Sequence, residues 1–165
     1  MAFTAQMNHP PSRNRESTPI SRYRHGLVSL LLVAAAMATA LTTIWRQSPG
    51  WGWLYLALVT AGSASILFAY CAKCPCRLHA CGHVIPGPLT RFLPAREQGS
   101  YGTIDYLGVI LPLALLLVIP QPWLWSDPPA MVLFWLLLAA GAMDILAFVC
   151  RGCDNHRCPL RHRRN

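Results

Sequence analysis

The stretch that decides the fold is residues 27–45, LVSLLLVAAAMATALTTIW, which no charged residue interrupts. An apolar helix of about 20 residues is long enough to cross the roughly 30 Å hydrocarbon core of a bilayer. Three more apolar stretches of similar length follow, at residues 51–71, 105–125 and 130–150. We therefore predict an all-α integral membrane protein with four transmembrane helices.

The overall composition argues against a separate soluble domain. Of the 165 residues, 54% are hydrophobic and only 12% are charged, about half the usual charged share. The net charge of +8 could indicate nucleic-acid binding, but no basic face interleaved with aromatic residues is apparent. Membrane orientation and attraction to anionic lipids explain the charge better. We therefore expect the lipid bilayer, and not nucleic acid, as the partner.

The basic residues predict the orientation of the helices. Residues 1–25, 72–104 and 151–165 hold every Lys and Arg except Arg46, and four spans place these three segments on one side. The positive-inside rule makes that side cytoplasmic. We therefore predict a multi-pass protein of the inner (cytoplasmic) membrane with both termini in the cytoplasm. Five tryptophans fall at the opposite interface, as an aromatic belt would: Trp45, Trp51, Trp53, Trp123 and Trp125.

These features divide the chain into five segments. A flexible basic arm and a basic tail, both expected to contact anionic lipids, enclose two helical hairpins joined by a loop that is rich in cysteine and histidine. Pro10, Pro11 and Pro19 disfavour regular structure in the arm. The predicted boundaries are 1–25 for the arm, 26–71 for the first hairpin, 72–104 for the loop, 105–150 for the second hairpin and 151–165 for the tail.

The two hairpins have the same plan, which indicates an internal repeat. The second helix of each ends in C-x2-C, at Cys71/Cys74 and at Cys150/Cys153. Tandem repetition of a two-helix unit gives a pseudo-two-fold axis along the membrane normal, which would bring the two pairs face to face. The alternative is two separate cysteine patches.

Small side chains also predict how the first two spans pack. They recur every four residues, which places them on one helix face where another backbone can approach closely. On this basis the first two spans should pack against each other along two stripes, Ala34/Ala38/Thr42 and Ala57/Ala61/Ser65/Ala69.

All seven cysteines lie at the ends of the second and fourth spans or soon after them, on the predicted cytoplasmic side. Cytosolic thiols stay reduced, so clustered cysteines there are more often metal ligands or redox-active groups than structural disulfides. Thiolate and imidazole ligands suit zinc or an iron–sulfur cluster, and the sequence does not choose between them or between one shared site and two. The candidate ligands are Cys71, Cys74, Cys76, Cys81, His83, Cys150, Cys153, His156 and Cys158.

The function predicted from these features is that of a metal-binding or electron-transfer subunit, with a membrane or redox protein of unknown identity as its partner. A thiol–disulfide oxidoreductase, a metal-ion transporter and a structural subunit with a zinc clasp are the alternatives. Transport would draw on Asp144, since an acid inside a span is a functional candidate; Asp144 could instead pair with Arg151 or another basic side chain. No catalytic motif is present, and whether the protein is an enzyme stays open.

Overall fold

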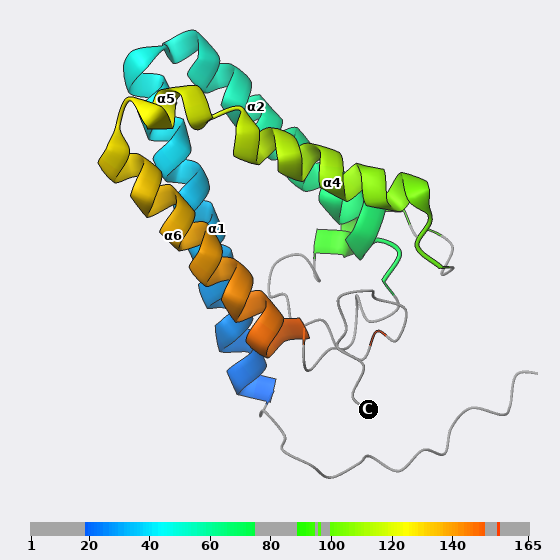
Figure 1. The fold of residues 1–165 in the computed structure, drawn as a ribbon. Helices are drawn as coiled ribbons and strands as arrows, with labels where there is room; N and C mark the ends of the chain where they lie inside the picture. Colours follow the sequence, from blue (N-terminus) through cyan, green and yellow to red (C-terminus); the bar gives the residue numbers. More distant parts are fainter. Residues whose placement is uncertain (1–18, 75–88, 95, 97–99, 151–154, 156–165) are drawn as a thin grey trace, which may run out of the picture.

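The computed structural model describes residues 19–74, 89–94, 96, 100–150 and 155. These residues form helices and short connections, and they contain no strand (Figure 1). The helices are α1 (Pro19–Gln47), α2 (Pro49–Ile66), α4 (Thr103–Val118), α5 (Gln121–Trp125) and α6 (Pro128–Asp144), with a 3₁₀ turn η2 (Thr90–Phe92) and two π-helical turns, η1 (Leu67–Cys71) and η3 (Ile145–Val149).

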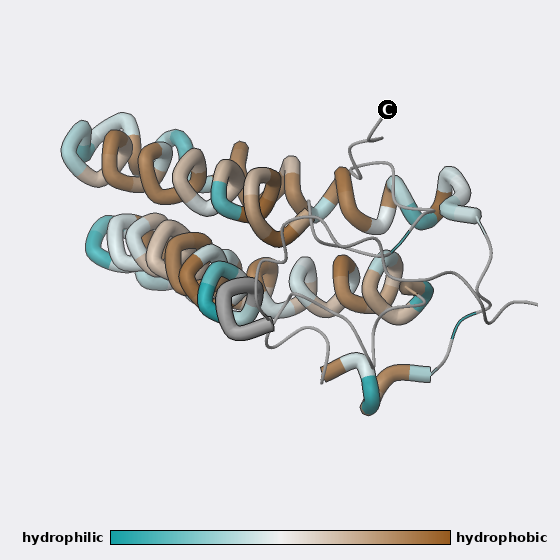
Figure 2. Tube along the Cα trace, turned by 90° about the horizontal axis from the view of Figure 1, so that it is seen from below, coloured by the Kyte–Doolittle hydropathy of each residue, from teal (hydrophilic) through white to brown (hydrophobic). Residues whose placement is uncertain are grey.

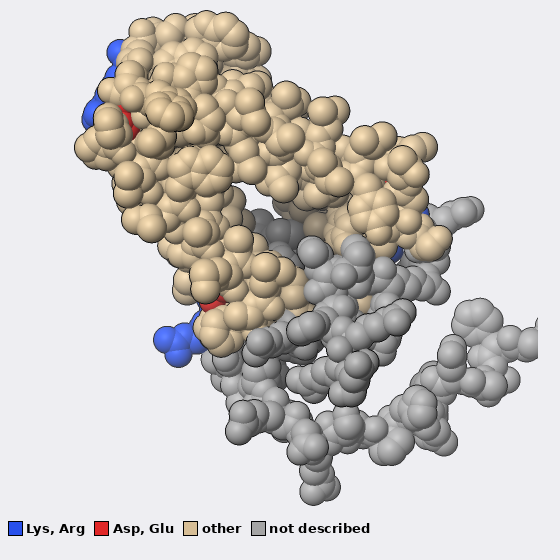
Figure 3. Space-filling view, in the orientation of Figure 1, with Lys and Arg blue, Asp and Glu red and all other residues tan. Residues whose placement is uncertain are grey.

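Four helical stretches are long and apolar enough to cross a membrane, which confirms the prediction of a four-span, all-helical protein. Charged side chains on the visible helices gather at the two ends of the molecule and leave the middle uncharged (Figure 3). That distribution is expected for helices whose middle lies in hydrocarbon. The four stretches are Tyr23–Gln47, Pro49–Cys71, Thr103–Trp125 and Pro128–Val149.

Prolines lie at two helix ends in the structure. Helix α1 begins at Pro19, inside the predicted arm of residues 1–25; proline is well tolerated in a first helical turn, where its missing N–H would have no partner. Residues 1–18 of that arm lie outside the described part. Within the third span, α4 ends at Val118 and α5 begins at Gln121, because Pro120 cannot continue the hydrogen-bond pattern of α4.

The four long helices form two layers that stack on each other. In Figure 1, α1 and α2 lie behind α6 and α4, and Figure 2 shows the two layers from below. Helix α1 packs mainly on α6, whereas α2 packs on α4 and to a similar extent on α1, and η1 continues the contact with α4. We call these two pairs the α1–α6 arm and the α2–α4 arm. The arms meet at one end of the molecule and diverge towards the other (Figure 1).

The α2–α4 arm is held by two hydroxyl groups of α2 that bond to carbonyls of the third span. Ser65 Oγ donates to the Gly108 carbonyl at 3.0 Å, and the Tyr55 hydroxyl donates to the Leu116 carbonyl at 3.0 Å. The residue four positions after each carbonyl is a proline, Pro112 or Pro120, so neither carbonyl can receive its usual helical N–H. Neighbouring hydroxyls commonly satisfy such carbonyls in membrane helices.

Glycines allow close approach inside each arm. A methyl group at Gly108 would lie 2.7 Å from the Ala69 β-carbon, and one at Gly62 would lie 3.3 Å from the Pro112 β-carbon. In the α1–α6 arm, a methyl group at Gly141 would lie 3.2 Å from the Val33 side chain. Small residues therefore do mediate packing, but between α2 and α4 and between α1 and α6.

The predicted packing along two small-residue stripes is wrong. The first two spans do contact each other, through Trp45 stacked over Gly52 and through Tyr55, whose hydroxyl lies 3.5 Å from Met37 Sδ. The stripe residues of α1 face outward, as do the first two of α2. The exposed stripe residues are Ala34, Ala38, Thr42, Ala57 and Ala61.

The buried core lies in the half of the molecule where the arms meet. Tyr55 and Phe134 are almost completely buried there, and Gln47 Nε2 bonds to Ser126 Oγ at 2.8 Å across the connecting turns. Tryptophans surround this end, with Trp45 on Trp53 and Trp51 on Trp123 at ring-centroid distances of 4.7 and 5.4 Å. The core residues are Ala36, Ala40, Ile44, Tyr55, Leu116, Leu124 and Phe134. We call this the aromatic end and the opposite one the cysteine end.

Candidate functional site

The helices that lead to the two C-x2-C pairs finish in the same way. Helix α2 passes into η1, where Ala72 N–H donates to the Leu67 carbonyl at 2.8 Å, and α6 passes into η3, where Cys150 N–H donates to the Ile145 carbonyl. Each is one turn of π-helix, a rare form that is frequently found at functional sites. Cys71 ends the first turn and Cys150 follows the second, and both cysteines are half-buried.

The structure describes three of the nine predicted ligands: Cys71, Cys74 and Cys150. Among the described residues, no group of three or more His, Cys, Asp or Glu side chains is arranged to hold a metal ion. The metal site therefore stays a prediction. The six other predicted ligands lie outside the described residues: Cys76, Cys81, His83, Cys153, His156 and Cys158.

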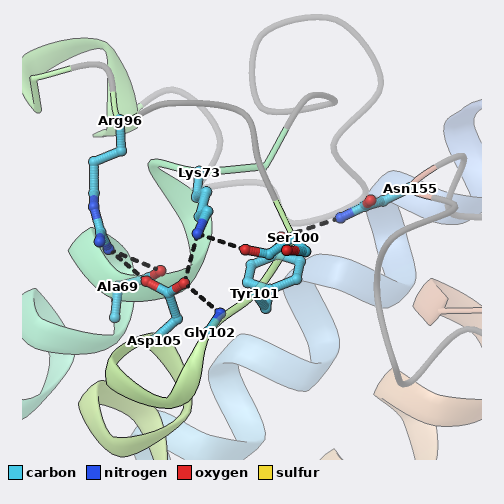
Figure 4. Close-up of polar contacts among 8 residues, drawn as sticks. All are labelled: Ala69, Lys73, Arg96, Ser100, Tyr101, Gly102, Asp105 and Asn155. Carbon is cyan, nitrogen blue, oxygen red and sulfur yellow. Dashed lines mark hydrogen bonds and ion pairs between the residues drawn. The ribbon is translucent and has the colours of Figure 1, made fainter.

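A buried charge cluster fixes the chain between Cys71 and Cys74. Lys73 Nζ lies 2.7 Å from Asp105 Oδ2, and Arg96 lies 2.8 Å from Asp105 Oδ1 (Figure 4). Asp105 is only 2% exposed, and its Oδ2 also accepts the Gly102 N–H at 2.9 Å, in the first turn of α4. Both carboxylate oxygens are therefore satisfied, as a buried charge requires.

The cluster joins three separate segments of the chain. Besides their bonds to Asp105, Lys73 donates to the Ser100 carbonyl at 2.7 Å and Arg96 donates to the Ala69 carbonyl at 3.4 Å. The start of α4 is thereby tied to the last turn of the second span and to the loop after it. Because Lys73 stands inside the first C-x2-C, the cluster restricts where that pair can move.

Asn155 brings the tail onto the first cysteine pair. Its side-chain amide lies 3.5 Å from Cys74 Sγ and 3.2 Å from the Tyr101 hydroxyl (Figure 4). Asn155 is 2% exposed, and Tyr101 stacks on Tyr70 with ring centroids 4.3 Å apart. A thiol sulfur is only a weak acceptor, so this hydrogen bond contributes little energy. Its importance is that Asn155, two positions after Cys153 in the sequence, contacts the first cysteine pair.

A second polar pair joins the two helices of the α1–α6 arm. His25 Nδ1 lies 2.8 Å from Asp144 Oδ1, and the imidazole stacks on Phe148 with centroids 4.0 Å apart and planes 6° from parallel. The Asp144 side chain is 14% exposed, and its Oδ2 is buried with no hydrogen-bond partner among the described residues. Of the roles weighed for Asp144, pairing with a basic side chain is the one observed, with His25 as the partner.

The sequence pointed to Asp144 more clearly than to the other members of these two clusters, because an acid inside an otherwise uncharged span requires a partner. Asp105, at the start of the third span, was not among the predicted site residues. His25, Arg96 and Asn155 carried no comparable signal, because each lies in a segment that is rich in polar residues. Their roles depend on which helices pack together.

At the cysteine end, the structure thus describes Cys71 and Cys74 at a helix end that the Asp105 cluster braces, and Cys150 directly after η3. Comparison with protein-family models, with curated proteins and with solved structures found no match for this chain.

Proposed function

We propose that this protein is a metal-binding or electron-transfer subunit of the cytoplasmic membrane, in which both C-x2-C pairs contribute to one metal centre at the cysteine end. The observation that carries the proposal is the contact of Asn155 with Cys74. Asn155 lies between Cys153 and Cys158 in the sequence, so the tail that bears these thiols returns to the first pair. Two separate patches would not require that return.

A tandem duplication of one helical hairpin supports a shared centre. Gln47 and Ser126, which are 79 residues apart, bond directly to each other, as equivalent residues beside a two-fold axis do. The same offset relates two close contacts, that of Gly62 with Pro112 and that of Gly141 with Val33. Gly141 is the equivalent of Gly62, and Val33 is the equivalent of Pro112. It also relates Pro49 to Pro128 at the helix starts, Tyr55 to Phe134 in the core, Cys71 to Cys150 and Cys74 to Cys153.

Four thiolates from two such pairs suit tetrahedral zinc or an iron–sulfur cluster. The remaining predicted ligands allow a larger cluster or a second ion. A cluster would transfer electrons, whereas zinc has no redox chemistry and would only fasten the loop to the tail. The chain's own contribution is to brace the helix ends, through Asp105 in the α2–α4 arm and through His25 and Asp144 in the α1–α6 arm.

The experiment that tests the proposal is metal and labile-sulfide analysis of protein purified without oxygen, with a visible spectrum. We expect a stoichiometric metal content that Cys71→Ser and Cys150→Ser each abolish, because the two halves share one centre. Thr60→Ala, on an exposed face of α2, is the control and should keep the metal. Loss of only part of the metal in each Cys variant would indicate two sites, and wild-type protein without metal would refute the proposed function.

The proposed orientation places the metal centre in the cytoplasm. A reporter that is active only in the cytoplasm, fused after Asn165, should be active in intact cells. A fusion at Gly50, in the first turn of α2 at the aromatic end, should be inactive. The opposite pattern would overturn the orientation, which rests on the distribution of Lys and Arg.

A further inference from the structure

We propose that residues 89–94, which contain the turn η2, form a binding site for the headgroup of an anionic phospholipid in the leaflet at the cysteine end. Phe92 and Leu89 enter the bilayer there, and Arg91 binds the lipid phosphate. This site does not depend on the metal centre of the proposed function.

The turn η2 is fixed against the end of the second span. Thr90 is completely buried, and η2 packs on η1. The Leu93 N–H donates to the Thr90 carbonyl at 3.2 Å and closes the turn. Soon after it in the sequence, Arg96 Nη1 lies 2.8 Å from Asp105 Oδ1 at the start of α4. The side chains of η2 are therefore held in a defined place on the α2–α4 arm.

That place lies beside the last turn of the second span, which ends at Cys71. Arg96 donates to the Ala69 carbonyl at 3.4 Å, and its guanidinium lies 5.2 Å from the ring centroid of Phe68. Both of these partners belong to η1. Arginine side chains near the ends of spans reach the interface between acyl chains and headgroups. Because η2 packs on the same turn, it lies at the membrane surface.

Two apolar side chains of this segment face away from the protein. Phe92 is 87% exposed and Leu89 is 43% exposed. Figure 2 shows the segment outside both helical layers, next to the layer that contains α2. An aromatic ring has a large apolar area that gains from leaving water. On the outer side of a membrane-spanning arm, the apolar phase that the ring can enter is the bilayer.

Arg91 supplies the charge that selects an anionic lipid. It is exposed and forms no ion pair with another described residue, whereas Lys73 and Arg96 both bind Asp105. Residues 72–104 hold four basic residues and a single acid, so this part of the chain attracts anionic headgroups. A planar guanidinium binds phosphate through two parallel hydrogen bonds. An arginine beside an inserted phenyl ring therefore fits a phospholipid at the membrane surface.

A fluorescent amino acid, incorporated genetically at position 92 and excited outside the absorption of tryptophan, tests the site in the full-length protein in phosphatidylcholine nanodiscs. Nitroxide-labelled phosphatidylglycerol and nitroxide-labelled phosphatidylcholine, at the same low mole fraction, are the lipid quenchers, and iodide is the aqueous quencher. We expect strong quenching by lipid and weak quenching by iodide. Phosphatidylglycerol should be enriched at the probe roughly fivefold over phosphatidylcholine, the effect of one basic residue near an anionic lipid.

Two variants and a second probe position are the controls. Arg91→Gln should abolish the enrichment, and Arg46→Gln, which removes an exposed arginine at the aromatic end, should leave it unchanged. A probe at Leu107, an exposed position on α4 of the same arm, should be quenched equally by both lipids. The same signal at Leu107 in the Arg91→Gln variant shows that this variant is folded.

Strong quenching of residue 92 by iodide would show that it faces water, as a docking site for a soluble protein would, and would overturn the proposal. Quenching by neither lipid nor iodide would show that protein covers the residue, which also contradicts insertion. Equal quenching by the two lipids, or an enrichment that persists in Arg91→Gln, would refute headgroup binding. Each of these results leaves the metal content of the protein, and with it the proposed function, to be decided separately.

Discussion

The bond from Ser65 to the carbonyl of Gly108 gives the sharpest test of how the α2–α4 arm is built. The carbonyl lacks its helical donor because Pro112 has no N–H, and Ser65 Oγ supplies a replacement at 3.0 Å. Ser65→Ala should therefore leave a partly buried carbonyl unsatisfied. The expected loss is about 1 kcal/mol of unfolding free energy, since hydrogen bonds between membrane helices average about 0.6 kcal/mol with a maximum near 1.7.

The proline allows a thermodynamic cycle that isolates this bond. Pro112→Ala restores an N–H that can reach the Gly108 carbonyl, and alanine keeps the β-carbon of residue 112 that lies next to Gly62. In the Pro112→Ala background, Ser65→Ala should therefore cost close to nothing. The expected coupling between the two substitutions is about 1 kcal/mol, within the range that residues sharing one hydrogen bond show.

The assay is reversible unfolding in mixed micelles, followed by loss of helical circular dichroism as the SDS fraction rises. Thr60→Ala is the control, because the Thr60 hydroxyl bonds only to carbonyls of its own helix, at Leu56 and Ala57. The reasoning is refuted if Ser65→Ala costs the same with and without Pro112, or if Thr60→Ala costs as much as Ser65→Ala.

Three further substitutions test other contacts by the same unfolding assay. Asp105→Asn should cost about 3 kcal/mol of unfolding free energy, since it breaks a buried ion pair whose cationic partners keep some hydration. The control Asp127→Asn should cost under about 1 kcal/mol, because asparagine caps a helix as well as aspartate does. Equal costs would contradict the burial assigned to Asp105. Gly108→Ala should cost about 1–3 kcal/mol, because its new methyl group would lie 2.7 Å from the neighbouring helix, and Gly50→Ala, which has open space, should not destabilise. Asp144→Leu should be close to neutral or stabilising if the buried pair contributes no net stability, and a loss above about 3 kcal/mol would show that the pair holds the α1–α6 arm together.

The four spans could be predicted from the sequence because a membrane helix needs only length and a lack of charge. The ends at Cys71 and Trp125 followed from the polar residues and prolines around them. Helix packing was harder to predict, because lipid-facing and buried positions are equally apolar in a membrane protein. Ala34 and Ala36 are both small, yet only Ala36 is buried, and nothing in the sequence distinguishes them.

The chemistry of the candidate site stays a prediction from the sequence, and its geometry could not be predicted. Clustered thiols at two helix ends indicated metal binding whatever the tertiary structure. That Asn155 reaches Cys74, and that Asp144 meets His25, depends on α1 packing on α6 and α2 packing on α4. The pairing of α1 with α6 joins the first and fourth spans, which are not consecutive in the sequence. No local pattern in the sequence specifies either pairing.

One proline accounts for the main chemical difference between the halves under the proposed duplication. Ser65 corresponds to Asp144 at the 79-residue offset, and Pro112 corresponds to Val33. In the first case, Pro112 leaves a carbonyl that requires a donor, and serine supplies it. In the second, Val33 has its own N–H for the helical bond, so nothing requires a donor at position 144. That position could therefore become acidic and pair with His25, and the resulting charge lies only six residues before Cys150. The spans that lead to Cys71 and to Cys150 therefore differ near their ends, with a neutral serine at position 65 and an acid at position 144.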